Sequence, residues 1–260
     1  MRHPAGSSGS RGVARSAPFL LLSIRGEDEA ADDEYRAMMR FAGVDTAGMH
    51  RIRLTHEPLG RIDLADYSGV ILGGGPYNVS DLADAKSQTQ RRAEAELLDL
   101  LARIVDEDFP FLGCCYGVGT LGSVIGARID RTYPEPVGGV SVTVTAEGRD
   151  DDLFADVPDV FDAYGGHKEG ASSLPAEAVR LASSPDCPVQ AFRVGRNVYA
   201  TQFHPELDLD GLITRINVYK NHGYFPPESA ESLKTAARQW DVRYPPKILK
   251  RFADKYARRG

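Results

Sequence analysis

The sequence predicts an α/β protein built on a doubly wound, mostly parallel sheet. Three short apolar runs, at 19–24, 70–72 and 109–112, each end in glycine or turn residues. Uninterrupted apolar runs of this length are typical of parallel strands that helices cover on both faces. Residues 29–41 and 88–105 lie between the runs and are expected to be helical. In such a sheet, ligands bind beyond the carboxyl ends of the strands.

The remaining elements follow from weaker patterns. Polar and apolar residues alternate at 141–145 and in part of 197–202, which predicts strands that expose one face and could be antiparallel additions. Further helices are expected at 211–221 and 228–240, separated by a Phe-Pro-Pro break. A last helix is expected to begin near Pro245 and Pro246.

The last helix combines an apolar stripe with basic surroundings. Its stripe and its flanking charges are Ile248, Leu249, Phe252 and Tyr256, and Lys247, Lys250, Arg251 and Lys255. Of two interpretations, the first is that the stripe packs on this chain's own domain while the charges are solvated. The second is a docking face for a partner subunit. We expect the first, because most amphipathic helices bury their apolar face within their own domain.

Length and composition bound the protein's class. With 260 residues, of which 42% are hydrophobic, the chain can bury one α/β core, alone or with an appended subdomain. We expect a disordered tail at 1–17, a catalytic domain at 18–222 and a helical extension at 223–260. Three cysteines make no disulfide framework, which favours a reducing, cytoplasmic location. A net charge of −6 disfavours nucleic-acid binding, and the first apolar run is too short for a membrane span.

A cysteine framed by glycines follows the third apolar run, in Gly113-Cys114-Cys115-Tyr116-Gly117. Glycines two residues to either side permit the sharp strand-to-helix turn that exposes a nucleophile, and only Cys115 has both. Cys114 should point to the opposite face as a small buried hydrophobe. If Tyr116 opens a helix, the positive end of its dipole favours a thiolate at Cys115. We call the segment 113–117 the elbow.

A histidine that could serve as the base lies in Gln202-Phe203-His204-Pro205-Glu206. Proline disfavours a helical conformation at His204, and in extended chain His204 and Glu206 point to the same face. Glu206 can then orient the imidazole of His204 and stabilise its charged form, while the other ring nitrogen faces the thiol.

A glycine loop, Gly73-Gly74-Gly75-Pro76, directly follows the second apolar run. Such a loop brings backbone close to a ligand and can aim an N–H at a developing oxyanion. The N–H groups of Gly75 and Tyr116 would together form a two-donor oxyanion hole.

These three segments, in this order, resemble the class I (triad) glutamine amidotransferases, in particular the subgroup similar to the glutaminase domain of GMP synthase. The similarity covers roughly residues 18–222. It implies Cys115 as nucleophile, His204 as base and then acid, and Glu206 as the orienting group. Gly74 and Gly119 fall at substrate-binding positions. Gly166-His167-Lys168-Glu169 resembles the family's Ser-His-Gly-Asp loop, which would place His167 beside the site.

One residue departs from that family. Most members carry glutamine where this chain has Gly119, and that glutamine helps to hold the substrate's amino-acid head group. A glycine has no side chain with which to do so. Either another residue holds glutamine, or the substrate is a different γ-glutamyl amide.

The resemblance leaves three functions open. The first is a glutaminase that hydrolyses the side-chain amide of glutamine through a thioester, without metal or organic cofactor. Its ammonia would pass to a separate synthase polypeptide, since no ATP-binding loop of the GMP synthase type occurs here. The second is a free-standing hydrolase of γ-glutamyl amides. The third is a regulatory or binding protein that retains the three residues with little turnover.

Overall fold

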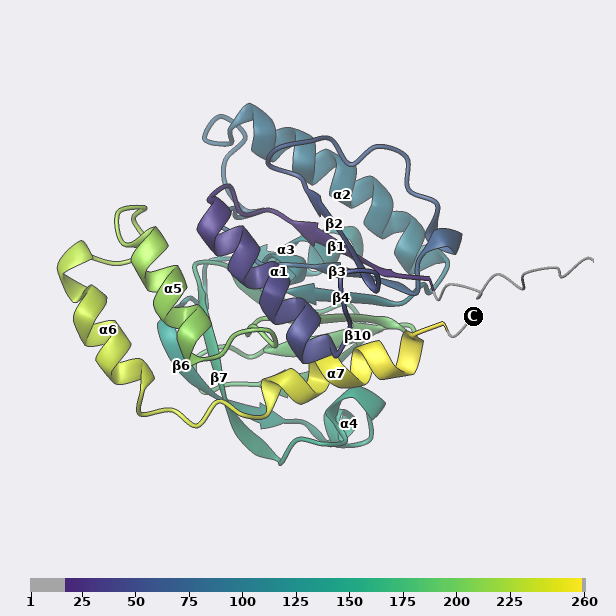
Figure 1. The fold of residues 1–260 in the computed structure, drawn as a ribbon. Coiled ribbons are helices and arrows are strands. Elements are labelled where there is room, and N and C mark those ends of the chain that lie inside the picture. Colours follow the sequence, from purple (N-terminus) through teal and green to yellow (C-terminus); the bar gives the residue numbers. More distant parts are fainter. Residues whose placement is uncertain (1–16, 259–260) are drawn as a thin grey trace, which may run out of the picture.

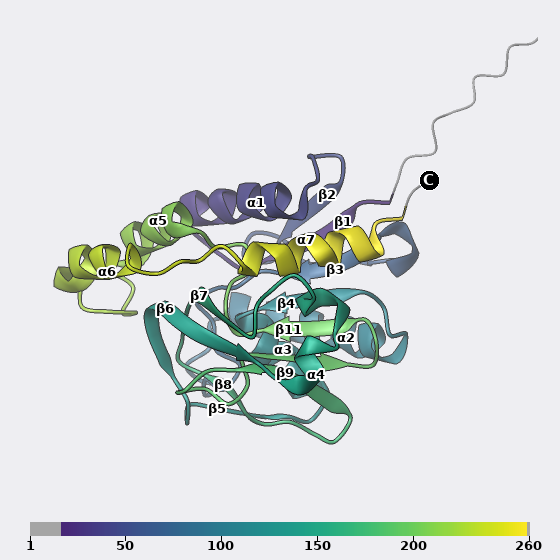
Figure 2. The ribbon, with the colours of Figure 1, turned by 90° about the horizontal axis from the view of Figure 1, so that it is seen from below.

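A computed structural model describes residues 17–258, in which a large sheet lies between two layers of helices (Figures 1 and 2). The strands of this sheet are β1 (Phe19–Ser23), β2 (Met49–Arg53), β3 (Gly69–Leu72), β4 (Phe111–Cys114), β6 (Glu135–Val144), β7 (Val160–His167), β9 (Ala178–Ser183), β10 (Ala191–Val194) and β11 (Val198–Thr201). A small second sheet pairs β5 (Arg128–Asp130) with β8 (Gly170–Ser173).

The helices are α1 (Asp28–Ala42), α2 (Gln88–Asp106), α3 (Tyr116–Val124), α4 (Ala146–Arg149), α5 (Leu209–Tyr219), α6 (Ala230–Ala237) and α7 (Pro245–Tyr256). Three short 3₁₀ turns accompany them, at Leu64–Asp66, Asp152–Phe154 and Pro227–Ser229. Local signals set several ends. The Ser87 side chain accepts from the Gln90 N–H and caps α2, and Gly43 ends α1 in a left-handed conformation.

The large sheet has the order β2-β1-β3-β4-β11-β10-β9-β6-β7. Its first five strands are parallel, and the pairs beyond β11 are antiparallel. The chain moves outward from β1 to β2 and then returns to β3 on the other side, so the parallel part is doubly wound. The predicted fold class, with antiparallel additions and C-terminal helices, is therefore confirmed.

Alternating strand residues form the two cores. Leu20, Leu22 and Leu72 face α2 and α3, whereas Phe19, Leu21 and Ile71 face α1 and α7. Figure 2 shows these two pairs of helices on opposite faces of the sheet. This double burial explains why the first strands have no polar face.

The apolar stripe of α7 packs on the chain's own domain, as expected. Ile248, Leu249 and Phe252 are fully buried beside β1 and α1, and Tyr256 packs at the edge of the same core. Figure 1 shows α7 next to the C-terminal end of α1. The docking interpretation of this stripe is therefore wrong, because the stripe is already covered within the chain's own helix layer.

The expectation for 197–202 needs correction. Strand β11 pairs parallel with β4 and antiparallel with β10, and its four residues are buried. Because β11 lies inside the sheet, it has no exposed face of the kind that we expected. No local pattern in the sequence reveals this interior position. By contrast, 141–145 overlaps the end of β6, which is antiparallel and partly exposed.

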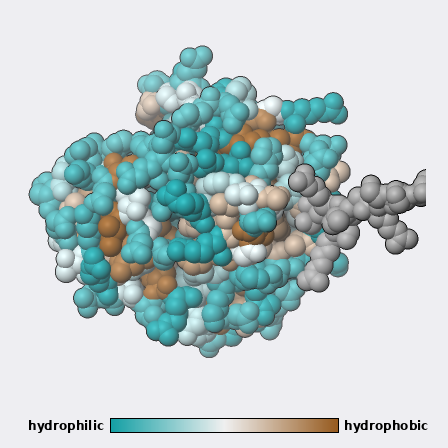
Figure 3. All heavy atoms as spheres, viewed as in Figure 1, coloured by the Kyte–Doolittle hydropathy of each residue, from teal (hydrophilic) through white to brown (hydrophobic). Residues whose placement is uncertain are grey.

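Of the predicted tail at 1–17, all but Ala17 lies outside the described residues, and the boundary at 222 and 223 stays a prediction. Within 17–258, no helix is both long enough and apolar enough to cross a membrane. On the face in Figure 3, hydrophilic residues predominate and apolar residues show as separate groups.

Candidate active site

The candidate site lies at the carboxyl ends of four neighbouring parallel strands. Strands β1, β3, β4 and β11 are adjacent in the sheet and end at the same edge. Arg25 follows β1, the glycine loop 73–75 follows β3, Cys115 follows β4 and His204 follows β11. Segments far apart in sequence meet here because parallel strands bring their carboxyl ends together.

The elbow has the strained geometry expected of a nucleophile turn. Cys115 has φ 55° and ψ −87°, an unusual conformation for a residue other than glycine, and α3 begins at the next residue. A Cβ at Gly113 would lie 2.8 Å from Gly117 Cα, so glycine is needed at position 113, where the strand and helix backbones touch. The Cys115 N–H donates to Thr201 O over 2.7 Å, which fastens the elbow to β11.

The two adjacent cysteines differ as predicted. Cys114 is fully buried in the core that faces α1 and α7, and burial raises its pKa well above the ordinary thiol range. Cys115 is only partly buried and lines two cavities. Cys114 is therefore a core residue, and Cys115 is the accessible thiol of the pair.

His204 belongs to a buried, charged network. Its Nδ1 lies 2.8 Å from Glu206 Oε1, and Arg215 on α5 donates to the same oxygen over 2.7 Å. Nδ1 is also 3.0 Å from Arg215 Nη1. A carboxylate can only accept, so Nδ1–H pointing at Glu206 leaves Nε2 as the proton acceptor. Within residues 17–258, Nε2 has no hydrogen-bond partner.

Gly74 provides the surface on which the imidazole of His204 rests. A Cβ at Gly74 would lie only 2.4 Å from His204 Cε1 and 3.3 Å from Arg25 Nη2. Any side chain at position 74 would therefore displace the ring. Gly74 acts here through His204, rather than as a residue that lines either cavity.

We expect Gly74→Ala to lower kcat/KM for the protein's substrate by at least about 10²-fold, since a shift of about 1 Å in a reacting group has that effect. Gly26→Ala is the matched control, because a Cβ there meets nothing within 4 Å. Circular dichroism and the melting temperature show whether both variants stay folded. Full activity in folded Gly74→Ala would contradict the placement of His204.

The two candidate oxyanion donors lie beside the thiol. Gly75 lines both cavities with Cys115, and Tyr116 lines the second of them. Neither N–H donates to another group within the described part of the chain. A Cβ at Gly75 would lie 2.5 Å from Ile24 Cγ1, so the loop packs tightly enough to fix its backbone.

Glu169 occupies the space that a side chain at position 119 would need. A Cβ at Gly119 would lie 2.7 Å from Glu169 Oε1. The two oxygens of Glu169 accept the N–H groups of Val79 and Ser80, each over 2.7 Å. Gly119 therefore lies behind Glu169 and does not line either cavity, whereas Glu169 and His167 line the second cavity.

Comparison with known proteins decides the family. The family model for glutamine amidotransferase class-I matches residues 45–216, which include Cys115, His204 and Glu206. The chain belongs to the class-I glutamine amidotransferases. A glutamine-hydrolysing GMP synthase subunit from Thermoplasma acidophilum is 26% identical over 173 residues, covering 66% of this chain and 76% of that protein.

Other relatives agree with this assignment. The GMP synthase of Edwardsiella ictaluri is 28% identical over 146 residues, or 54% of this chain, and the chain matches only 25% of that protein's length. A glutamine amidotransferase structure from Thermotoga maritima superposes with a TM-score of 0.72 at 22% identity, covering 92% of this chain and 97% of that one. This structural match supports the amidotransferase fold.

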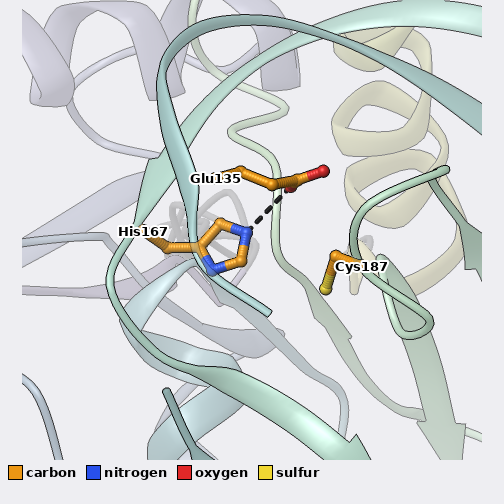
Figure 4. A group of neighbouring side chains, drawn as sticks. All are labelled: Glu135, His167 and Cys187. Carbon is orange, nitrogen blue, oxygen red and sulfur yellow. Dashed lines mark hydrogen bonds and ion pairs between the residues drawn. The ribbon is translucent and has the colours of Figure 1, made fainter. Parts of the chain in front are cut away.

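A second Cys-His-Glu group lies elsewhere in this amidotransferase (Figure 4). Ligand atoms of Glu135, His167 and Cys187 lie within 4.8 Å of one another. His167 uses both ring nitrogens, since Nε2 is 2.8 Å from Glu135 Oε2 and Nδ1 is 2.8 Å from Glu169 O. Burial raises the pKa of Cys187 to about 11, and its thiol donates to Val189 O.

This second group is a hydrogen-bonded cluster without a free base. Glu135 also accepts from Ser184 and Gln190, each over 2.6 Å, so both of its carboxylate oxygens are engaged. A cation would have to displace these bonds before it could bind. Of the two groups, the one at Cys115 has the elbow, a thiol that lines both cavities, and an unoccupied imidazole nitrogen.

In the resting site, the Cys115 thiol and the His204 imidazole are both expected to be neutral. Burial raises the pKa of Cys115 to about 11, with Arg25 opposing this rise, so the thiolate expected from the helix dipole is not the resting form. Burial lowers the pKa of His204, and Arg215 adds to this effect while Glu206 opposes it. Burial would raise the pKa of Glu206, but the charge of Arg215 and the hydrogen bonds from His204 and Arg215 outweigh it and keep the carboxylate ionised.

The lowered pKa of His204 predicts the acid side of the pH profile. Only the neutral imidazole accepts a proton, and it predominates above a pKa that lies below the ordinary value of 6.5. We therefore expect kcat/KM to stay level near neutrality and to fall only when the pH drops below 6.5. A steady-state pH series measures this. An acid limb with its midpoint above neutrality would contradict a buried, neutral His204.

Several residues of the site gave no signal in the sequence. Arg25 and Arg215 lie in a network with Glu34 and Glu206, all four buried. Arg25, Arg215 and Glu34 are ordinary charged residues on or near a helix, with no motif around them. A buried charge needs an opposite charge close by, and that need becomes visible only when the fold has removed the solvent.

Proposed function

We propose that this amidotransferase hydrolyses the side-chain amide of glutamine, with Cys115 as nucleophile, His204 as base and acid, and Glu206 as the orienting group. The observation that carries the proposal is the convergence of the elbow, the glycine loop and His204 at the ends of adjacent strands. Cys115 and His204 line one cavity. Membership of the class-I family supports the same chemistry.

The reaction follows from these positions. Cys115 Sγ attacks the amide carbon of glutamine as its proton moves to His204 Nε2. The N–H groups of Gly75 and Tyr116 stabilise the oxyanion, and they need no rearrangement because they have no other acceptor within residues 17–258. His204 then protonates the departing ammonia. A water molecule, deprotonated by His204, hydrolyses the γ-glutamyl thioester and releases glutamate.

Glu169 would hold the amino-acid head group in place of the glutamine missing at position 119. Its carboxylate lines the cavity that also contains Cys115 and Tyr116. Each oxygen accepts one backbone N–H, so acceptor capacity remains for the substrate's α-ammonium group. The backbone bonds also fix the carboxylate, which lowers the entropic cost of binding.

The ammonia would pass to a separate synthase polypeptide. The Thermoplasma acidophilum relative is named as one subunit of a GMP synthase. The match covers 76% of that subunit. The GMP synthase of Edwardsiella ictaluri extends well beyond the matched region. The acceptor of the nitrogen is therefore proposed to be another chain.

Hydrolysis of ¹⁵N-amide glutamine by the purified protein tests this function. We expect labelled ammonia and glutamate in equal amounts, with asparagine inert because its amide is one carbon nearer to the head group. Release of neither product from glutamine, with or without an added GMP synthase polypeptide that lacks a glutaminase domain, would overturn the proposal.

A further inference from the structure

Two cavities meet at the sulfur of Cys115, and they differ in chemistry. We call the one that contains Arg25 and His204 the arginine cavity, and the one that contains Tyr116 and Glu169 the elbow cavity. Counting the space open to solvent, the arginine cavity holds about 500 Å³ and the elbow cavity about 330 Å³. Cys115, Gly75, Gly166 and Tyr224 line both.

We propose that the arginine cavity binds a leaving group larger than ammonia, namely the second residue of a γ-glutamyl dipeptide with an apolar side chain. This inference rests on the proposed function and extends its substrate class. An amide bond attacked by Cys115 has an acyl half and an amine half, and each half needs its own space.

His204 and Tyr116 each line only one of the two cavities, whereas Gly75 lines both, so the first two indicate which half lies where. His204, which protonates the amine, lines the arginine cavity, and Tyr116, which faces the acyl oxygen, lines the elbow cavity. The glutamyl half therefore belongs beside Glu169 and the amine half beside Arg25.

The walls of the arginine cavity suit an apolar side chain. Leu212 and Ile216 of α5 contribute aliphatic surface, and Tyr219 and Phe225 add aromatic surface. All belong to the segment that follows His204 in the chain. A passage used only by ammonia needs no such lining, whereas leucine or phenylalanine would bury its side chain there.

The charge of the cavity selects a carboxylate. Arg25 is 4% exposed, and its Nε and Nη1 are bonded to Glu34 and Tyr219. Its Nη2 has no partner within residues 17–258 and is not fully buried, so a free donor remains accessible at the cavity. Arg215 also lines the cavity, while Glu34 and Glu206 lie outside the lining. Because Arg215 is already paired with Glu206, the free Nη2 of Arg25 is the donor that can bind the carboxylate of a leaving amino acid, and a cationic amine would be repelled by it.

The bond changes are those of amide hydrolysis through a thioester. Cys115 Sγ forms a bond to the γ-carbonyl carbon, the bond from that carbon to the dipeptide nitrogen breaks, and His204 transfers its proton to that nitrogen. The free amino acid leaves from the arginine cavity. Water then releases glutamate, so no oxidant, reductant or second organic substrate is needed.

Competing substrates test the inference on the unaltered protein. We expect kcat/KM for γ-glutamyl-leucine to exceed that for glutamine by at least about 10-fold, the effect of one charge-assisted hydrogen bond. Converting the dipeptide's carboxylate to an amide should remove most of this gain, and γ-glutamyl-1,4-diaminobutane should be poorer still. Because these changes are made to the substrate, no variant has to fold.

One variant adds an independent check. Phe225→Ala should lower kcat/KM for γ-glutamyl-leucine more than for glutamine, whereas Tyr133→Ala, which alters an exposed side chain outside both cavities, should not change their ratio. If glutamine is hydrolysed and the dipeptide is no better, the inference is wrong and the proposed function stands. If no γ-glutamyl amide is hydrolysed, both fail.

Discussion

Replacing Cys115 by serine is expected to lower kcat/KM for glutamine by at least about 10⁴-fold, the scale seen when a nucleophile of a hydrolase triad is removed. The serine hydroxyl keeps the approximate size of the thiol but is a far weaker nucleophile under the same base. Because Cys115 is at an elbow whose close backbone contact requires glycine at 113, a neighbouring residue cannot take its place.

The other two cysteines provide the controls. Cys187→Ser changes the thiol of the second Cys-His-Glu group, and Cys114→Ala changes a core thiol next to Cys115. We expect both to retain kcat/KM within a few-fold, with some loss of melting temperature because both side chains are buried. Loss of activity in Cys187→Ser together with normal activity in Cys115→Ser would transfer the chemistry to the second group and refute this account.

Removing the imidazole should have an effect of similar size. We expect His204→Asn to lower kcat/KM by about 10⁴-fold, because the neutral thiol at position 115 then has no group to accept its proton. Asparagine retains a polar group of similar size, so the network of Glu206 and Arg215 keeps a partner. His56→Asn, at a half-exposed position outside both cavities, is the control.

The combination of the two substitutions is the stronger test. Nucleophile and base act as one unit, so the double variant should be little worse than either single variant. Initial rates with concentrated enzyme measure this. Losses that multiply would mean that the two residues act independently, which is incompatible with proton transfer between them.

The sequence predicted the parts of this protein whose signals are local. The runs at 19–24 and 70–72 could be identified because strands covered on both faces carry no polar residues. The stripe of Ile248, Leu249 and Phe252 could be assigned because helical spacing shows which residues share a face. The family followed from three segments in order, and the family model confirms it.

The parts that failed depend on neighbours distant in the chain. Strand β11 is buried on both sides because β4 and β10 flank it, which its own alternating residues do not reveal. The prediction of a thiolate at Cys115 rested on the helix dipole alone. It did not include burial, which has the larger effect on the pKa of this thiol. Arg215 could not be found, because its role depends on the position of α5 beside Glu206.

Gly119 and Glu169 show how one departure becomes intelligible in three dimensions. The sequence shows only that a glutamine is missing at 119. In the fold, Glu169 occupies that place and is held by two backbone N–H groups. A side chain at 119 and the observed position of Glu169 are therefore mutually exclusive.

The most direct measurement is to identify the side chain that a reactive glutamine analogue modifies. The diazoketone analogue of glutamine alkylates the nucleophile that attacks its carbonyl region, and peptide mapping by mass spectrometry locates the label. Our account predicts one label per chain, on Cys115, prevented by excess glutamine and greatly slowed in His204→Asn. A label on Cys187 or Cys114, or an unreactive Cys115 in the folded protein, would contradict it.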